Sequence, residues 1–108
     1  EKVLKAKDID TVVTGKRLGH PVRSIRNSFT KEYQACEYDR TNCDDEKLES
    51  MGTGKLRLAA REGDVKNGTV LAGQVAAMVK KEQPAKEIIE EMFTQAEETL
   101  KGATQWVK

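Results

Sequence analysis

The chain has 108 residues, of which 37% are hydrophobic and 34% are charged, and its 19 basic and 18 acidic side chains leave a formal net charge of +1. This length suffices for one small domain, and the balanced charge argues against a dedicated nucleic-acid binder, which carries a clear basic excess. No apolar run approaches the roughly 20 residues of a membrane span. Because the first residue is Glu1 and not a methionine, we expect a fragment or a processed product.

The first quarter of the sequence predicts a β-hairpin. A lysine-rich lead-in over residues 1–8 precedes a β-branched run over residues 9–14, which is typical of a strand. Glycines and a proline in residues 15–21 predict a turn, and residues 22–27 alternate imperfectly between apolar and polar side chains. We therefore expect two strands that are joined by a long loop.

Short helices are predicted to follow the hairpin. Ser28 or Thr30 can cap the first of them, and Gly63 can end the last. A polar, acidic loop over residues 39–46 lies between the first two, and we expect it to be mobile. The predicted helices span residues 30–38, 45–51 and 55–62.

Apolar residues dominate the last third of the sequence. Thr69 can cap a helix that runs to about Lys81, and apolar side chains cover nearly every face of it, so we expect this helix to be buried. Its Gly73 is expected to permit close approach by another backbone or a ligand. A final helix is predicted to begin at Pro84, with one apolar stripe at helical spacing. Since these elements cannot cover a helix that is apolar all round, we expect the rest of a larger protein to do so.

Metal, redox-pair and phosphate-loop chemistry are not indicated. His20 is the sole histidine and has no second ligand at metal spacing. Cys36 and Cys43 are separated by six residues, which fits neither a redox pair nor a zinc knuckle. We therefore expect two reduced thiols and a reducing, cytoplasmic location. Residues 52–55 read Gly-Thr-Gly-Lys but lack the glycine spacing and the following Ser or Thr of a phosphate loop.

Charge is distributed in blocks along the chain. Residues 1–31 hold eight basic and three acidic side chains, residues 32–50 hold two and seven, residues 51–81 hold six and two, and residues 82–108 hold three and six. Such blocks form solvated faces or surfaces that meet other charged surfaces. One basic cluster that can meet phosphate groups or an acidic partner comprises Lys16, Arg17, His20, Arg23 and Arg26.

The start of the predicted buried helix is a second candidate for binding. Residues 69–74 read Thr-Val-Leu-Ala-Gly-Gln, and free N–H groups at a helix start can face an anion or a polar ring. Gln74 is a polar side chain on an otherwise apolar helix, and if it is buried it needs a hydrogen-bond partner. Backbone, water or a ligand can supply that partner, so a purely structural role stays open.

Several motifs, taken in order, resemble one enzyme family. They are Lys-Ala-Lys-Asp-Ile-Asp-Thr at 5–11, Gly-His-Pro-Val-Arg-Ser-Ile-Arg-Asn at 19–27, Met-Gly-Thr-Gly at 51–54, Glu-Gly-Asp-Val at 62–65 and Gly-Thr-Val-Leu-Ala-Gly-Gln-Val-Ala at 68–76. Their order and spacing resemble the C-terminal third of bacterial flavin-dependent enoyl-acyl-carrier-protein reductases II, over essentially the whole chain. Nitronate monooxygenases share the fold and the Ala-Gly-Gln signal, so they are the close alternative.

The resemblance implies an α/β fold, namely the C-terminal part of a TIM barrel with an inserted α+β substrate lid. Residues 1–58 would be the lid segment, and residues 59–108 would be closing helices of the flavin-binding barrel. The segment alone would be mostly helical, with one short hairpin. It would also be inactive, because the family's catalytic histidine and its FMN-phosphate loops lie upstream and His20 does not match that histidine.

The resemblance also implies a reaction and its participants. The family reduces the trans-2 double bond of enoyl thioesters with NADH or NADPH in fatty-acid synthesis, and the hydride passes through FMN. The acidic acyl carrier protein presents the substrate, and a homodimer is one open assembly state. Site residues implied for the substrate are Leu71, His20, Arg23 and Arg26, and those implied for the flavin are Ala72, Gly73 and Gln74. A different class of function, a small non-enzymatic module that binds an acidic protein, stays open as well.

Overall fold

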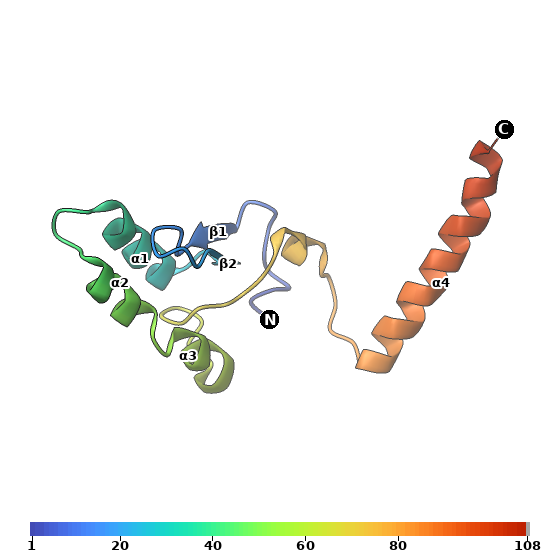
Figure 1. Ribbon diagram of the computed structural model, residues 1–108. Helices are drawn as coiled ribbons and strands as arrows, with labels where there is room; N and C mark the ends of the chain where they lie inside the picture. The colour runs from blue at the N-terminus through green and yellow to red at the C-terminus, as the bar shows by residue number, and fades with distance from the viewer. Residues whose placement is uncertain (108) are drawn as a thin grey trace.

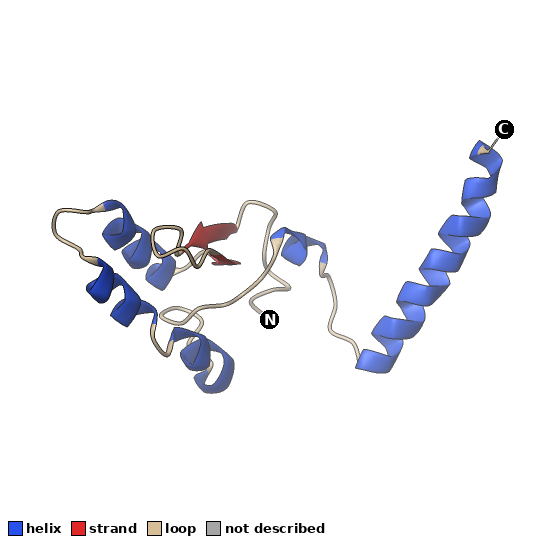
Figure 2. Cartoon of the chain, in the orientation of Figure 1, coloured by secondary structure: helices blue, strands red, loops and turns tan. Residues whose placement is uncertain are grey.

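The computed structural model describes residues 1–107 and consists mainly of helices beside one small sheet (Figure 1, Figure 2). In chain order the elements are β1 (Thr11–Thr14), β2 (Val22–Ile25), α1 (Ser28–Tyr38), α2 (Asp45–Gly52), α3 (Lys55–Glu62), the 3₁₀ helix η1 (Gln74–Met78), α4 (Ala85–Ala103) and the 3₁₀ helix η2 (Thr104–Trp106). These bounds confirm the predicted hairpin, the three short helices and the final helix. Among the described residues, no helix combines the length and the apolar character needed to cross a membrane.

The hairpin is antiparallel, as its sequence predicts. Thr11 pairs with Ile25 and Thr14 with Val22, so β1 and β2 are fully in register over their four residues. The β-branched residues of β1 favour the extended backbone because their side chains pack well on a pleated surface. The seven-residue loop between the strands, residues 15–21, carries the sole histidine of the sequence, His20.

The predicted helix over residues 69–81 is wrong. Residues 69–72 are extended and run beside β2: Leu71 forms an antiparallel bridge with Ser24, and Ala72 N–H donates to Arg23 O at 3.3 Å. Only η1 is helical, and it has a 3₁₀ conformation. The hydrogen bonds to β2 compete with helix formation in a segment whose Thr, Val and Gly residues have low helix propensity. An apolar run without periodicity therefore forms an extended segment beside β2 here, in place of a helix.

Asn27 caps α1, and this corrects the prediction that Ser28 or Thr30 does so. Its Oδ1 accepts a hydrogen bond from Thr30 N–H at 2.9 Å, and its own N–H donates to Thr30 Oγ1 at 2.9 Å. This reciprocal arrangement is a capping box in which threonine takes the place of the usual glutamate. The helix therefore begins two residues earlier than predicted.

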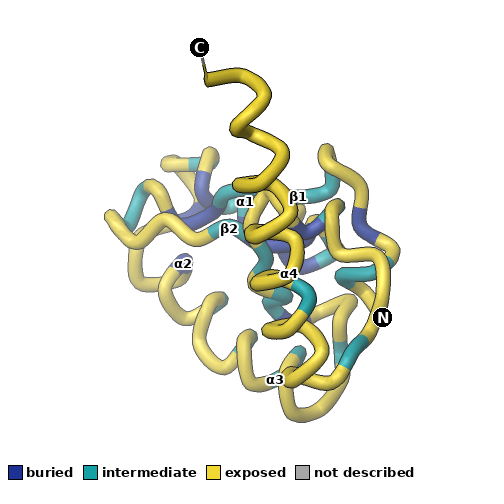
Figure 3. Tube along the Cα trace, turned by 90° about the vertical axis from the view of Figure 1, so that its right-hand side faces the viewer, coloured by how far each residue is buried: buried dark blue, intermediate teal, exposed yellow. Residues whose placement is uncertain are grey.

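Two small clusters of buried apolar residues hold the folded part together, and Figure 3 shows them as isolated dark segments in a mostly exposed chain. One joins α1 to α2, and the other joins the N-terminal turn, β2 and η1. The first contains Phe29, Tyr33, Cys43 and Leu48, and the second contains Ala6, Ile25 and Ala76. Cores of this size leave much apolar surface uncovered.

The final helix α4 lies apart from the rest of the chain (Figure 1). For this reason the molecule is elongated, with extents of 61 × 35 × 19 Å. Its predicted apolar stripe is present but exposed: Met92 is 58% and Phe93 75% accessible. Lys81 and Gln83 reach Glu91 at 2.9 Å and 2.8 Å, and these are the links between the preceding connector and the helix within residues 1–107. An apolar face of this extent is typical of a surface that other parts of a protein cover.

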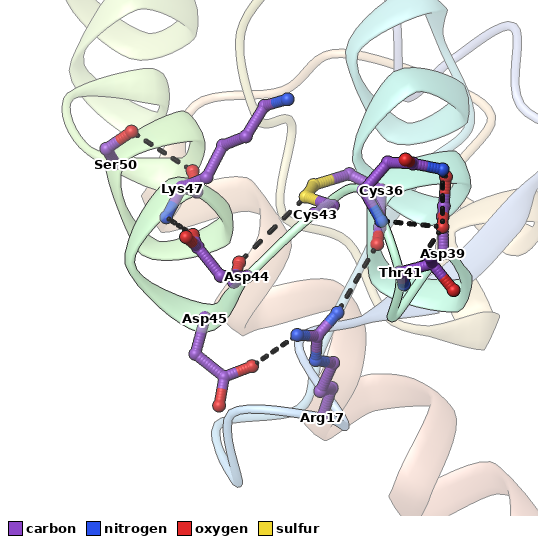
Figure 4. The surroundings of a disulfide bond; sticks show 10 residues. Arg17, Cys36, Asp39, Thr41, Cys43, Asp44, Asp45, Lys47 and Ser50 are labelled. Atoms are coloured by element: carbon purple, nitrogen blue, oxygen red, sulfur yellow. Dashed lines mark hydrogen bonds and ion pairs between the residues drawn. A yellow bond between two sulfur atoms is a disulfide. The ribbon is translucent and has the colours of Figure 1, made fainter.

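Cys36 and Cys43 form a disulfide, so the prediction of two reduced thiols is wrong (Figure 4). Their Cα atoms are 5.4 Å apart, well inside the range that a disulfide bridges. The bond closes the loop between α1 and α2, where Asp39 Oδ1 also accepts hydrogen bonds from Thr41 and Asn42 N–H. A hydrogen bond from the Asn42 side chain lowers the pKa of Asp39 most, and the backbone hydrogen bonds from Asn42 and Thr41 lower it further.

Candidate functional site

A cleft of about 220 Å³ lies between the hairpin loop, α1, the end of α2 and the extended segment 69–72. It brings together two of the predicted substrate residues, His20 and Leu71, which are 51 positions apart in the sequence. The other lining residues are mostly apolar or small; they are Thr14, Gly15, Val22, Phe29, Tyr33, Gly52, Leu56 and Thr69. Such a composition, apolar with a few polar groups, is typical of small-molecule sites.

The hairpin loop fixes the backbone of His20 at the rim of this cleft. Gly15 has φ +80°, and a Cβ at this position would lie 2.5 Å from His20 O, so only glycine fits. His20 N–H donates to Gly15 O at 3.0 Å, and Gly19, also with positive φ, donates to Lys16 O at 3.1 Å. The imidazole itself is exposed, which leaves it free to contact a bound molecule.

Two aromatic residues of α1 form the inner wall of the cleft. Phe29 and Tyr33 are one helical turn apart, and their ring centroids are 5.7 Å from each other. Burial raises the pKa of the Tyr33 hydroxyl, and the negative charges of Glu37 and Glu49 raise it further. Tyr33 is therefore a neutral hydroxyl at physiological pH, able to donate one hydrogen bond. Sequence analysis missed it, although the Phe-x-x-x-Tyr spacing of residues 29–33 is a usable signal.

Leu71 enters the cleft from the segment beside β2, and the residues that follow it leave the cleft. Ala72 packs on the cluster around Ile25 and Ala76, while Gly73 and Gln74 are exposed at the start of η1. No heavy atom lies within 4 Å of the position that a Cβ on Gly73 would take, so the expected close approach by backbone does not occur within residues 1–107.

This open stretch fits a planar, partly polar ring. Gly73 adds no side chain to fill the space, Gln74 offers an exposed amide, and Val75, 66% accessible, offers an apolar contact. An isoalloxazine ring needs both hydrogen bonds at its edge and apolar contact on its face. The residues present here therefore suit a flavin. Among residues 1–107, no group of His, Cys, Asp and Glu is arranged to hold a metal ion.

The predicted basic cluster of the hairpin does not form one surface. Arg17 is committed internally: it pairs with Asp45 at 2.7 Å, and its side chain is only 13% accessible (Figure 4). Arg23 turns to Thr11 Oγ1 at 3.1 Å, whereas Arg26 is exposed and lines a different groove, and Lys16 lines a third. The structure thus separates Arg23 and Arg26 from His20 and Leu71.

Comparison with known proteins identifies the family. Residues 1–95 match the nitronate monooxygenase family, and because this match covers most of the chain, the chain belongs to that family. None of the curated proteins matches the chain.

Two solved structures are similar to nearly the whole chain. FabK from Thermotoga maritima is 36% identical with a TM-score of 0.89, over 98% of this chain and 33% of FabK. A methionine-to-alanine mutant of the same FabK is 33% identical with a TM-score of 0.77, over 98% of this chain and 30% of the mutant. The chain spans about a third of the length of the structures it matches.

These similarities confirm the predicted fold class. The chain is a FabK-like segment, part of a TIM-barrel fold, and its own residues are mostly helical with a single hairpin. The exposed stripe of α4 and the small clusters of the folded part are consistent with a segment whose barrel neighbours lie outside these residues.

Proposed function

We propose that this chain is a segment of an FMN-dependent oxidoreductase that reduces the trans-2 double bond of enoyl thioesters with NADH or NADPH, as an enoyl-acyl-carrier-protein reductase. The observation that supports this most is the similarity to FabK, at 36% identity over 98% of the chain. The cleft adds chemical support, because an apolar wall with one histidine and one tyrosine suits an acyl chain that ends in a polar thioester.

Within this proposal each part of the chain has a role. Residues 1–58 form the substrate lid, and residues 59–108 return to the barrel as its closing part. Leu71 and the cleft hold the acyl chain and exclude water from it, while the exposed imidazole of His20 and the hydroxyl of Tyr33 contact the polar end. Of the two predicted arginines, the exposed Arg26 contacts the carrier or the cofactor phosphates, whereas Arg23 is held by Thr11 Oγ1. No residue of this segment is assigned a catalytic role, so the segment alone is inactive.

Ala72, Gly73 and Gln74 would hold one edge of the flavin. Bound FMN supplies the hydride relay between the nicotinamide cofactor and the double bond. Gly73 leaves space for a ring, and the exposed Gln74 amide would hydrogen-bond to its edge. Ala72 is packed on Ile25 and Ala76, which ties the position of this edge to the hairpin of the lid.

The family match supports a second candidate, a nitronate monooxygenase, which oxidises a nitronate with oxygen. A third candidate, a non-enzymatic module that binds an acidic protein, is less well supported because α4 exposes an apolar stripe that a free-standing module would have to cover. A cytoplasmic location is part of the first proposal.

The experiment that separates these candidates uses the full-length protein purified with its flavin. We expect oxidation of NADH or NADPH that depends on a crotonyl thioester, and no oxygen consumption with a nitronate. The reverse result favours the monooxygenase. Absence of bound flavin and of both activities favours the binding module.

The role of Leu71 is tested in the same assay. Leu71→Trp should fill the cleft and raise KM for longer acyl chains by about tenfold, since a bulky residue there displaces the chain. Tyr38→Trp is the matched control, because Tyr38 is exposed at the end of α1 and does not line the cleft. Equal KM values for Leu71→Trp and the wild type at every chain length would show that the acyl chain lies elsewhere.

A further inference from the structure

A groove of about 490 Å³ on another side of β2 gathers basic side chains, of which the proposed function uses only Arg26. It is walled by the N-terminal turn, the end of β2, the start of α1 and the loop at residues 64–68. Its basic residues are Lys2, Lys5, Arg26, Lys31 and Lys66, and Asp10 is the acidic residue among the lining residues described. We call this the basic groove.

The groove is where the two positive blocks of the sequence meet. Lys2, Lys5, Arg26 and Lys31 belong to the first block and Lys66 to the third. Hydrogen bonds fix the two blocks together: Phe29 N–H donates to Lys66 O at 3.3 Å. The Asn27 side chain reaches the same loop, donating to Val65 O and Gly68 O. The positive charges are therefore held side by side by the fold itself.

These charges are not neutralised within residues 1–107. Of the five basic residues only Lys5 forms an ion pair there, with Glu1. The other four are exposed and unpaired in the described chain, whereas Arg17, outside the groove, is buried against Asp45. Like charges held close together repel one another, and an anionic partner removes this repulsion. The arrangement thus favours binding of something negative.

The geometry suits an extended acidic surface more than a small phosphate. A phosphate site usually offers free N–H groups at a helix start. Two of these groups at the start of α1 are already occupied, because Phe29 N–H bonds to Lys66 O and Thr30 N–H bonds to Asn27 Oδ1. What remains are long, flexible, exposed lysine and arginine side chains on four separate segments. Such side chains match carboxylates spread along the face of a helix.

We propose that the basic groove docks an acidic helix of a partner protein. The proposal rests on the proposed function, under which this partner is the acidic acyl carrier protein that presents the enoyl thioester. It moves the carrier contact away from the predicted basic cluster of the hairpin, where Arg17 and Arg23 are committed to internal bonds, to a surface that includes Arg26. Docking here is electrostatic, so it weakens as salt rises.

The test compares the full-length wild type with Lys31→Glu/Lys66→Glu and with the control Arg40→Glu/Lys47→Glu, which makes the same charge change at exposed residues outside the groove. The same enoyl group is supplied on the carrier protein, on coenzyme A and on uncharged N-acetylcysteamine. We expect the groove variant to raise KM for the carrier-linked substrate by about tenfold and to lose much of its salt dependence, with the other two substrates and the control within about twofold of wild type.

Three results would overturn the proposal. They are an unchanged KM for the carrier-linked substrate, an equal rise with the coenzyme A thioester, which indicates a phosphate site, and an equal rise with N-acetylcysteamine, which indicates a general defect. If charge reversal prevents folding, Lys31→Gln/Lys66→Gln is measured instead, with an expected rise of about threefold. Direct titration of carrier protein onto wild type and variant separates the two proposals. If neither thioester is reduced, the function fails, yet a Kd weakened only in the groove variant still supports docking.

Discussion

The side-chain amide of Asn27 donates to Gly68 O at 2.7 Å, across 41 positions of sequence. The same amide donates to Val65 O at 2.9 Å, while its oxygen caps α1 through Thr30 N–H. One side chain therefore starts a helix and also holds the loop that leads from α3 to the cleft segment. Both the cleft and the basic groove depend on this link.

We expect Asn27→Asp and Asn27→Ala to separate these two tasks. Aspartate retains the helix cap but loses both amide donors, so it should cost about 1–3 kcal/mol. Alanine loses the cap as well and should cost about 1 kcal/mol more than aspartate. Hydrogen–deuterium exchange of residues 64–69 should accelerate in both variants, and exchange at the start of α1 only in Asn27→Ala. Identical exchange patterns in the two variants would contradict the assignment of the helix cap to the Asn27 oxygen and of the loop link to its amide.

Gly68 tolerates no side chain, because backbone of α3 passes directly against it. A Cβ there would lie 2.6 Å from Ala59 N and 2.8 Å from Asp64 O. Gly68→Ala should therefore destabilise the protein by about 2 kcal/mol or more, since backbone and not a flexible side chain must move. Gly102→Ala is the control: no atom lies within 4 Å, and in the helix α4 alanine should stabilise by about 0.5–1 kcal/mol. In urea unfolding, the free energy of unfolding should fall in Gly68→Ala and rise in Gly102→Ala.

The sequence predicts well those elements that have a regular hydrophobic periodicity or clear start and stop residues. Gly63 ends α3 with φ +74°, and Pro84 precedes α4, as their residue types indicate. Residues 69–81 lack such signals, since apolar side chains on every face occur in buried helices and in covered strands alike. Tertiary hydrogen bonds to β2 decide the outcome, and they are not visible in a single sequence. The Cys36–Cys43 pairing was missed because the cysteine spacing fits neither a redox pair nor a zinc knuckle and a reducing location was expected.

The cleft shows a similar division. His20 was a candidate because it is the sole histidine and lies on a loop, between a glycine and a proline. Leu71 was a candidate because of the family resemblance. Their juxtaposition depends on the bridge between Leu71 and Ser24, which places the cleft segment beside the hairpin. Tyr33 was missed because an aromatic residue on a short helix is read as core, and it is indeed part of the cluster with Leu48.

The loop after α3 should show a measurable pKa effect. Hydrogen bonds from the Asn67 side chain and backbone, with a smaller one from Lys66 N–H, lower the pKa of Asp64. A lowered pKa means that the carboxylate stabilises the fold above its ordinary pKa and that this contribution is lost as the pH falls below about 4. In Asn67→Ala the largest cause is removed, so the pKa of Asp64 should rise towards its ordinary value, as followed by NMR titration. Asn42→Ala, the control, should raise the pKa of Asp39 and leave that of Asp64 unchanged.

The Cys36–Cys43 disulfide should respond differently to the loss of either sulfur. It closes a loop of only a few residues between α1 and α2, so reduction should cost about 2 kcal/mol by chain entropy. Cys36→Ser and Cys43→Ser both lose the crosslink, but Cys43 is 4% accessible and packs against Leu48, so its serine hydroxyl is buried in an apolar cluster. Cys43→Ser should therefore cost about 1–3 kcal/mol more than Cys36→Ser. The measurement is urea unfolding with and without reductant: reductant should lower the stability of the oxidised wild type and leave both serine variants unchanged. A wild type whose midpoint ignores the reductant, and whose mass already includes two thiol hydrogens, would show that the pair is reduced in solution.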